Sequence, residues 1–218
     1  MSSIKYLRRY TDALVLLDMI KNERISLTSP DTWFDKNDTL GLKEYGLGKG
    51  TGRTHALCLT EAAETGHHWQ LFAGTSHGVC VMFDAEALKA HVAKYYPHLL
   101  QGPMHYINLK QLKEKYPFDN DELPFFKRKT FQDEKEYRIV SWTPDPNAGS
   151  TYDINIDRNI IQRVVFGPRM PKNLTETLRS VCETIADCNH IQFTSSRVEN
   201  NESWHDAIID PELASLLG

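Results

Sequence analysis

The sequence predicts an α+β fold, a single domain (residues 1–218) in which helices flank a bent, largely antiparallel, split sheet. Three observations predict it. The expected strands and helices follow one another in a mixed order, not in the regular alternation of a parallel α/β fold. Several segments alternate polar and apolar residues and end at turn signals rich in Gly, Pro and Asn. The chain has 218 residues and is 40% hydrophobic, which is enough for one sizeable core.

The first part of the chain predicts a strand, a helix, a second strand and a long loop. We expect a strand at 5–10, a helix at 13–20 and a strand at 24–28. Thr11 or Asp12 can cap the helix with a side-chain oxygen, and Pro30 stops the second strand. Residues 31–53 contain several glycines and little periodicity. This stretch predicts a long Gly-rich loop, of the kind that is often functional or partly disordered.

The rest of the chain predicts further strands and helices in mixed order. Residues 78–83 form an unbroken apolar run, which is typical of a strand buried on both faces. Asp84 follows this run and is suited to cap the next helix. We expect strands at 54–60, 104–108, 137–142, 152–156, 160–166 and 190–194, and helices at 67–72, 85–95 and 174–186.

Composition limits the classes of function. The net charge is -4 and the pI is about 6.1, so on the basis of charge alone we do not expect a nucleic-acid partner. Residues 127–129 form a local basic cluster, which we interpret as a solvated helix end. The four cysteines lie far apart, which indicates reduced, mostly buried thiols and no metal site. The first residues lack the apolar core of a signal peptide and no run could span a membrane, so we expect a cytoplasmic protein.

The segment 125–142 concentrates charge at the start of a strand. Side chains alternate along a strand, so Glu134, Glu136 and Arg138 are expected on one face. Buried charge is costly unless it is paired. Two interpretations follow: Glu136 and Arg138 form a structural ion pair with Glu134 in solvent, or the three residues line a cavity that uses them.

Seven fragments, in order along most of the chain, carry a family resemblance. They cover residues 9–20, 25–30, 58–61, 69–72, 78–84, 127–138 and 165–168. Together they resemble the mainly bacterial family catalogued as domain of unknown function 2971. The loop at 33–38 departs from the family pattern because it contains no proline. That family has no settled biochemical function, so the resemblance implies domain boundaries more than chemistry.

The order of parts is also loosely similar to that of ADP-ribosyltransferases. This similarity implies an enzyme that cleaves the nicotinamide–ribose bond of NAD, with a macromolecular acceptor that the sequence does not identify. Glu136 would be the anion beside the developing oxocarbenium ion, and Glu134 would orient or deprotonate the acceptor. The candidate groups for binding the dinucleotide are Arg9 (on the diphosphate), Tyr10, Thr28, Trp69 (stacked on a ring) and Arg138.

Other interpretations stay open. Tyr10 and Trp69 are large aromatics that are typical of core packing. A non-catalytic module could bind a nucleotide or a protein through the 31–53 loop and the basic cluster at 127–129. A third hypothesis is a metal-dependent nuclease, because 133–135 reads Asp-Glu-Lys.

Overall fold

The structure is a computed structural model that describes residues 5–33, 35–185 and 188–209. In this part of the chain, nine strands form one mixed sheet and two short strands form a second. The path through the large sheet is β11-β10-β4-β1-β3-β2-β9, while β8 pairs with β3 and β5 with β8. All pairs in this sheet are antiparallel except β10 with β11. The α+β class with a largely antiparallel sheet is therefore confirmed.

The strands match most of the expected ranges. Their bounds are β1 (Tyr6–Asp12), β2 (Arg24–Thr28), β3 (Arg53–Thr60), β4 (Gly78–Asp84), β5 (Leu100–Pro103), β6 (His105–Ile107), β7 (Phe126–Arg128), β8 (Glu136–Thr143), β9 (Thr151–Asn155), β10 (Ile161–Phe166) and β11 (Gln192–Ser195).

Two helices begin at side chains that were expected to cap them. Asp12 accepts hydrogen bonds at the start of α1, and Asp84 accepts one at the start of α4. The bounds are α1 (Ala13–Asn22), α2 (Lys36–Lys49), α3 (Gly66–Phe72), α4 (Ala85–Tyr95), α5 (Leu109–Glu114), α6 (Lys172–Glu183) and α7 (Glu202–Ile209), with 3₁₀ turns η1 (Pro30–Thr32), η2 (Asn120–Phe125), η3 (Lys129–Glu134) and η4 (Arg158–Ile160).

The large sheet is split between β1 and β3. These two strands pair at one position, Arg8 with Thr60. By contrast, β1 pairs with β4 along its whole length, and β3 does so with β8. The sheet therefore consists of three well-paired parts, β11-β10-β4-β1, β3-β8-β5 and β2-β9. β3 is joined to β1 at Arg8–Thr60 and to β2 at Thr28–Ala56, one position each.

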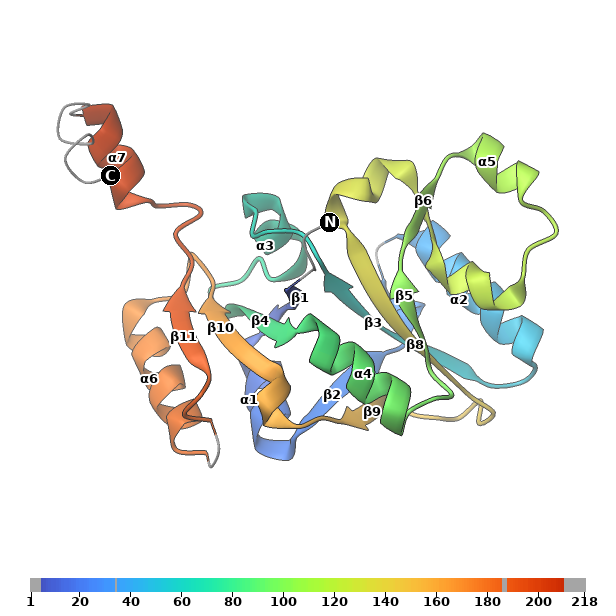
Figure 1. Cartoon of the computed structure of the whole chain (residues 1–218), viewed down its shortest axis with the longest axis horizontal. Helices are drawn as coiled ribbons and strands as arrows, with labels where there is room; N and C mark the ends of the chain where they lie inside the picture. Colours follow the sequence, from blue (N-terminus) through green and yellow to red (C-terminus); the bar gives the residue numbers. More distant parts are fainter. Residues whose placement is uncertain (1–4, 34, 186–187, 210–218) are drawn as a thin grey trace.

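Three hydrophobic clusters fill the space around the sheet. The main core takes side chains from α1, α4 and α6 and includes Leu16, Leu88 and Leu178. A second cluster packs α2 against β3 and β8, and a third packs α3 against β4 and β10. Figure 1 shows α2 toward one end of the molecule and α6, with β10 and β11, toward the other.

The predicted loop at 31–53 is wrong for most of its length, because α2 occupies Lys36–Lys49. Two glycines in α2 lie where a neighbour comes close. A Cβ on Gly46 would meet Thr54 Oγ1 at 2.7 Å, and one on Gly48 would meet the Asn120 side chain at 2.1 Å. The glycines therefore allow close packing and do not break the helix. The buried apolar side chains that α2 contributes to the second cluster are Leu42 and Tyr45.

The charged strand also begins later than an alternating strand from 134 would require. Lys135 has a φ of 42°, and Glu134 ends the 3₁₀ turn η3 before it. The strand β8 starts at Glu136. The expected strand at 104–108 is shorter as well, because β6 covers His105–Ile107. Two expectations fall on residues outside the described ones: that for residues 1–4, which were expected to lack a signal peptide, and that for residue 186, the predicted end of a helix.

Candidate functional site

A buried network joins five charged side chains at the start of β8. Lys127 Nζ lies 2.5 Å from a Glu134 oxygen, 2.8 Å from a Glu136 oxygen and 3.5 Å from an Asp38 oxygen. Arg138 donates two hydrogen bonds to Asp38, at 2.7 and 2.8 Å, and one to Glu136 at 2.7 Å. Its guanidinium also donates to the Pro124 carbonyl and lies over the Trp33 ring.

This network corrects two expectations. Lys127 is not part of a solvated helix end, because its side chain is 9% exposed and surrounded by carboxylates. Glu134 is not in solvent, since its side chain is 11% exposed and paired with Lys127. Desolvation of these charges is offset by mutual pairing, which is the condition for burying charge.

The network fixes the protonation of its members. Burial alone would raise the pKa of Glu136, but Arg138 and Lys127 outweigh it and hold that pKa below its usual value. Burial raises the pKa of Glu134, although Lys127 opposes the rise. The pKa of Lys127 is raised, because three carboxylates outweigh the effect of burial. Glu136 is therefore a fixed anion, and Glu134 is the carboxylate of the pair that accepts a proton more readily.

A second group of residues lies at the split of the sheet, and we call it the split cluster: Arg9, Ser26, Cys58 and Glu136. Arg9 Nη2 donates to the Ser26 carbonyl at 3.2 Å, while Arg9 Nη1 is buried and has no hydrogen-bond partner among the described residues. Burial lowers the pKa of Arg9 to about 10, and the proximity of Cys58 opposes this. A buried guanidinium nitrogen without a partner is rare and calls for an explanation.

Cys58 connects the two groups. Its thiol is exposed to solvent, unlike the buried Cys80 and Cys182. Burial and the neighbouring Glu136 carboxylate raise the pKa of Cys58 well above its usual value. Solvent therefore reaches the sheet at Cys58, while protein surrounds the thiol closely enough to disfavour its anion.

The remaining predicted binding residues are placed as follows. Thr28 is exposed at the end of β2 and pairs with Ala56, two residues before Cys58. Trp69 is 2% exposed and donates from Nε1 to Glu64 at 2.7 Å. Tyr10 packs edge-on against Trp69 at a centroid distance of 5.0 Å. Trp69 thus presents no open face in this structure, whereas Thr28 does lie near the split cluster.

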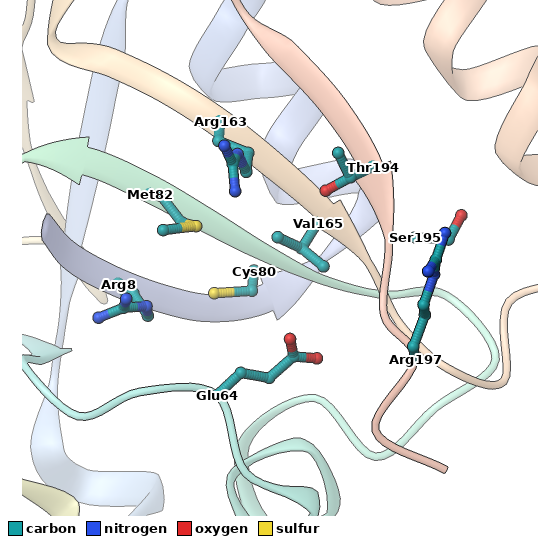
Figure 2. Close-up of a pocket in the computed structure, with 9 residues that line it drawn as sticks. All are labelled: Arg8, Glu64, Cys80, Met82, Arg163, Val165, Thr194, Ser195 and Arg197. Carbon is teal, nitrogen blue, oxygen red and sulfur yellow. The ribbon is translucent and has the colours of Figure 1, made fainter. Parts of the chain in front are cut away.

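A pocket of about 730 Å³ lies over β4 and β10 (Figure 2). Its floor is formed by Cys80 and Met82 of β4 and Val165 of β10. The other lining residues are Arg8, Glu64, Arg163, Thr194, Ser195 and Arg197. Arginines thus gather on one surface of a chain whose net charge is -4, and global charge is a poor guide to what this pocket binds.

Sequence reasoning missed Asp38, Cys58 and Arg8. Asp38 was assigned to a loop, and its partner Arg138 is 100 residues away along the chain. The thiols were expected to be mostly buried, with no role for Cys58, and Arg8 was not among the candidate binding residues. The sequence signal for Arg8 was the alternation of side chains along a strand: Arg8 and Arg9 must point to opposite faces, so each can serve a different surface of the sheet.

Comparisons with known proteins give a partial match. Residues 68–139 match a family model. That family is described as "Protein of unknown function (DUF2971)", so the resemblance found in the sequence is confirmed over this segment. A search of the curated proteins finds no match.

Similar solved structures include DarT from Thermus sp. 2.9. In complex with carba-NAD+, it has a TM-score of 0.44 and 8% identity, and the alignment covers 91% of this chain and 98% of that one. DarT in complex with ADP-ribosylated ssDNA has a TM-score of 0.45 and 7% identity, and the alignment covers 88% of this chain and 94% of that one. At these TM-scores and identities, the likeness carries neither a ligand nor an activity to this chain.

The nuclease hypothesis receives no geometric support. Asp133 pairs with His67 at 2.9 Å on the surface, Glu134 is buried, and Lys135 sits in a left-handed turn before the strand. Within residues 5–33, 35–185 and 188–209, no group of three His, Cys, Asp or Glu side chains could hold a metal ion. The helices of the same ranges include none that is long and apolar enough to cross a membrane.

Proposed function

We propose that the chain is an ADP-ribosyltransferase-like enzyme that binds NAD at the split cluster and cleaves its nicotinamide–ribose bond. The observation that carries the proposal is Arg9, a buried guanidinium with an unpartnered nitrogen at the split of the sheet. Its neighbour Cys58 is reached by solvent and contacts the Glu136 carboxylate. A cation, an access point and a fixed anion thus lie together.

The energetics of Arg9 favour an anionic ligand. Burial lowers the pKa of Arg9 from 12.5 to about 10. At neutral pH this difference corresponds to a cost of roughly 3 kcal/mol for keeping the guanidinium charged in the folded protein. A diphosphate oxygen at Nη1 would supply the missing acceptor and offset part of that cost through a charge-assisted hydrogen bond.

In this proposal, Glu136 supplies the negative charge for the reaction. The glycosidic bond between ribose C1′ and the nicotinamide nitrogen breaks, and nicotinamide leaves with the electron pair. Positive charge then develops on the ribose ring, and a preorganised carboxylate beside it lowers the barrier. Lys127 and Arg138 hold the two Glu136 oxygens in place, so no reorganisation is needed at that moment.

The acceptor then forms the new bond to C1′ and loses a proton. Glu134 is suited to take this proton, because burial raises its pKa towards that of a useful general base. Lys127 bridges the two carboxylates, whose pKa values are shifted in opposite directions. Glu136 therefore stays ionised while Glu134 can be protonated. The chemical identity of the acceptor is open in this proposal.

A non-catalytic nucleotide-binding module is the second candidate, and the buried network favours it. Both Glu136 oxygens are engaged in hydrogen bonds, which is also the arrangement of a purely structural ion pair. In that case Arg9 would still bind an anionic ligand, but no nicotinamide would be released.

The test measures NAD binding and nicotinamide release in the same samples. NAD at about a hundred times its dissociation constant should stabilise the fold by roughly 2.7 kcal/mol, visible as a raised midpoint in a thermal-shift titration. Arg9→Met should lose this shift. Arg158→Met is the matched control, since Arg158 is another partly buried arginine that donates to carbonyl oxygens, but far from the split cluster.

Chromatographic detection of nicotinamide separates the two candidates. Release by the wild type that is absent in folded Glu136→Gln supports the enzyme. Binding without release, in the wild type, supports the nucleotide-binding module. If NAD gives no shift, or shifts Arg9→Met as much as the wild type, NAD does not bind at the split cluster and the proposal fails.

A further inference from the structure

The pocket over β4 and β10 has free arginine donors. Arg8 donates one hydrogen bond, from Nη1 to the Ala62 carbonyl at 2.8 Å. Arg163 uses Nε and Nη2 on the Gln192 oxygen, which leaves Nη1. Arg197 makes no side-chain hydrogen bond or ion pair that involves another described residue. A guanidinium has five N–H donors, so most of the N–H groups of these three arginines donate no hydrogen bond to a described residue.

The acid in the pocket does not neutralise these arginines. Glu64 accepts hydrogen bonds from Trp69 Nε1 and from the Ser196 hydroxyl. It therefore ties the segment after β11 to α3 and holds Arg197 at the margin of the pocket. Figure 2 shows Arg8 on β1 and Arg163 on β10, with β4 between these strands, while Arg197 lies at the right of the floor and Glu64 below it. Three arginines against one engaged carboxylate leave an excess of positive charge.

The floor of the pocket is apolar, which limits the class of anion. Cys80, Met82 and Val165 are 2%, 6% and 8% exposed, and they belong to the hydrophobic cluster under α3. A volume of about 730 Å³ is in the range of pockets for small organic ligands. The hydroxyls of Thr194 and Ser195 line the same opening and can bind a sugar.

We propose that this pocket binds a mononucleotide, with the phosphate on Arg163 and the base over Cys80, Met82 and Val165, while Arg8 and Arg197 add positive charge at the other margins of the floor. Planar guanidinium groups are suited to phosphate, which they can bind with two parallel hydrogen bonds. The apolar floor contacts the flat face of the base. This site is separate from Arg9 and does not depend on the proposed function.

The test uses AMP as the probe and calorimetry as the readout. AMP should bind the wild-type protein, while adenosine, which lacks the phosphate, and inorganic phosphate, which lacks the base, should each bind at least tenfold more weakly. Arg163→Gln should weaken AMP binding at least tenfold. Arg179→Gln removes an exposed arginine of α6 outside the pocket and should leave the affinity unchanged.

Arg9→Met separates this proposal from the one on NAD, because AMP is also a part of NAD. The variant should bind AMP as the wild type does, even if it no longer binds NAD. Loss of AMP binding in Arg9→Met together with normal binding in Arg163→Gln would place AMP at the split cluster and overturn the proposal. Absence of AMP binding to the wild type would overturn it as well. Equal melting temperatures of the unliganded proteins confirm that Arg163→Gln is folded.

Discussion

Asp38 and Arg138 form a two-point hydrogen bond, at 2.7 and 2.8 Å, across 100 residues of sequence. The guanidinium of Arg138 is fully buried, and the Asp38 side chain is 5% exposed. This pair fastens α2 to β8 and also supports Glu136, which accepts from Arg138 Nε. The position of the candidate catalytic carboxylate thus depends on a helix that packs over the sheet.

Asp38→Asn is expected to destabilise the protein by about 3–5 kcal/mol, because it leaves the buried Arg138 with one carboxylate fewer. Urea unfolding measured by circular dichroism checks this. Glu86→Gln is the control: Glu86 is in an exposed pair with Lys89, and its loss should change the free energy of unfolding by no more than about 0.5 kcal/mol. Equal effects of the two substitutions would mean that the Asp38–Arg138 pair does not hold α2 to the sheet.

The parts of the fold that could be predicted are those that depend on local sequence. Alternation predicted β1 and β2, and the capping residues Asp12 and Asp84 were predicted because a cap is read from a few neighbouring residues. The helix α2 could not be predicted, since its glycines are needed for tertiary contacts: Gly46 meets Thr54 of β3, and Gly48 meets Asn120, which lies far along the chain.

The candidate site was predictable in its residue types and unpredictable in its connections. Pairing of Glu136 with Arg138 was one of the two interpretations of the sequence, and these residues do pair. The partners Asp38 and Lys127 come from segments assigned to a loop and to a solvated helix end, so nothing local indicated that they would be buried together. Cys58 lies on a strand with buried neighbours, and its exposure follows from the split between β1 and β3.

Arg9→Met is expected to leave the stability of the unliganded protein unchanged within about 1 kcal/mol, or to raise it. Arg9 is buried and incompletely hydrogen-bonded, so an apolar side chain of similar length removes a desolvation cost along with one bond to Ser26. Arg138→Met should instead lose stability, because it leaves the buried Asp38 and Glu136 carboxylates with Lys127 in place of two cations. Thermal unfolding of both variants checks the contrast. A large loss in Arg9→Met would assign Arg9 to the structural core.

Cys58 is expected to be accessible and yet slow to react. Burial and Glu136 raise the pKa of its thiol, so less thiolate is present at pH 8 than in the unfolded chain. Iodoacetamide labelling followed by peptide mass spectrometry should show slower alkylation of Cys58 in the native protein than in urea, and a rate that still rises above pH 9. Glu136→Gln should accelerate it, because a neighbouring negative charge is removed. Native alkylation as fast as in urea would contradict the raised pKa.

Glu136 is expected to make stability depend on acid pH. Its pKa is lowered in the folded state from 4.5, since Arg138 and Lys127 outweigh the effect of burial. A carboxyl with a lowered pKa contributes stability that is present above its unfolded pKa and is lost as pH falls through the folded value. The wild type should therefore lose its advantage over Glu136→Gln as pH decreases from 5 to 3 in urea unfolding experiments. Glu134 acts in the opposite direction: burial raises its pKa, so its contribution is present below the unfolded value and is lost as pH rises through the folded one. A free-energy difference between wild type and Glu136→Gln that stays constant over this range would show that Glu136 is not held as an anion by its two cations.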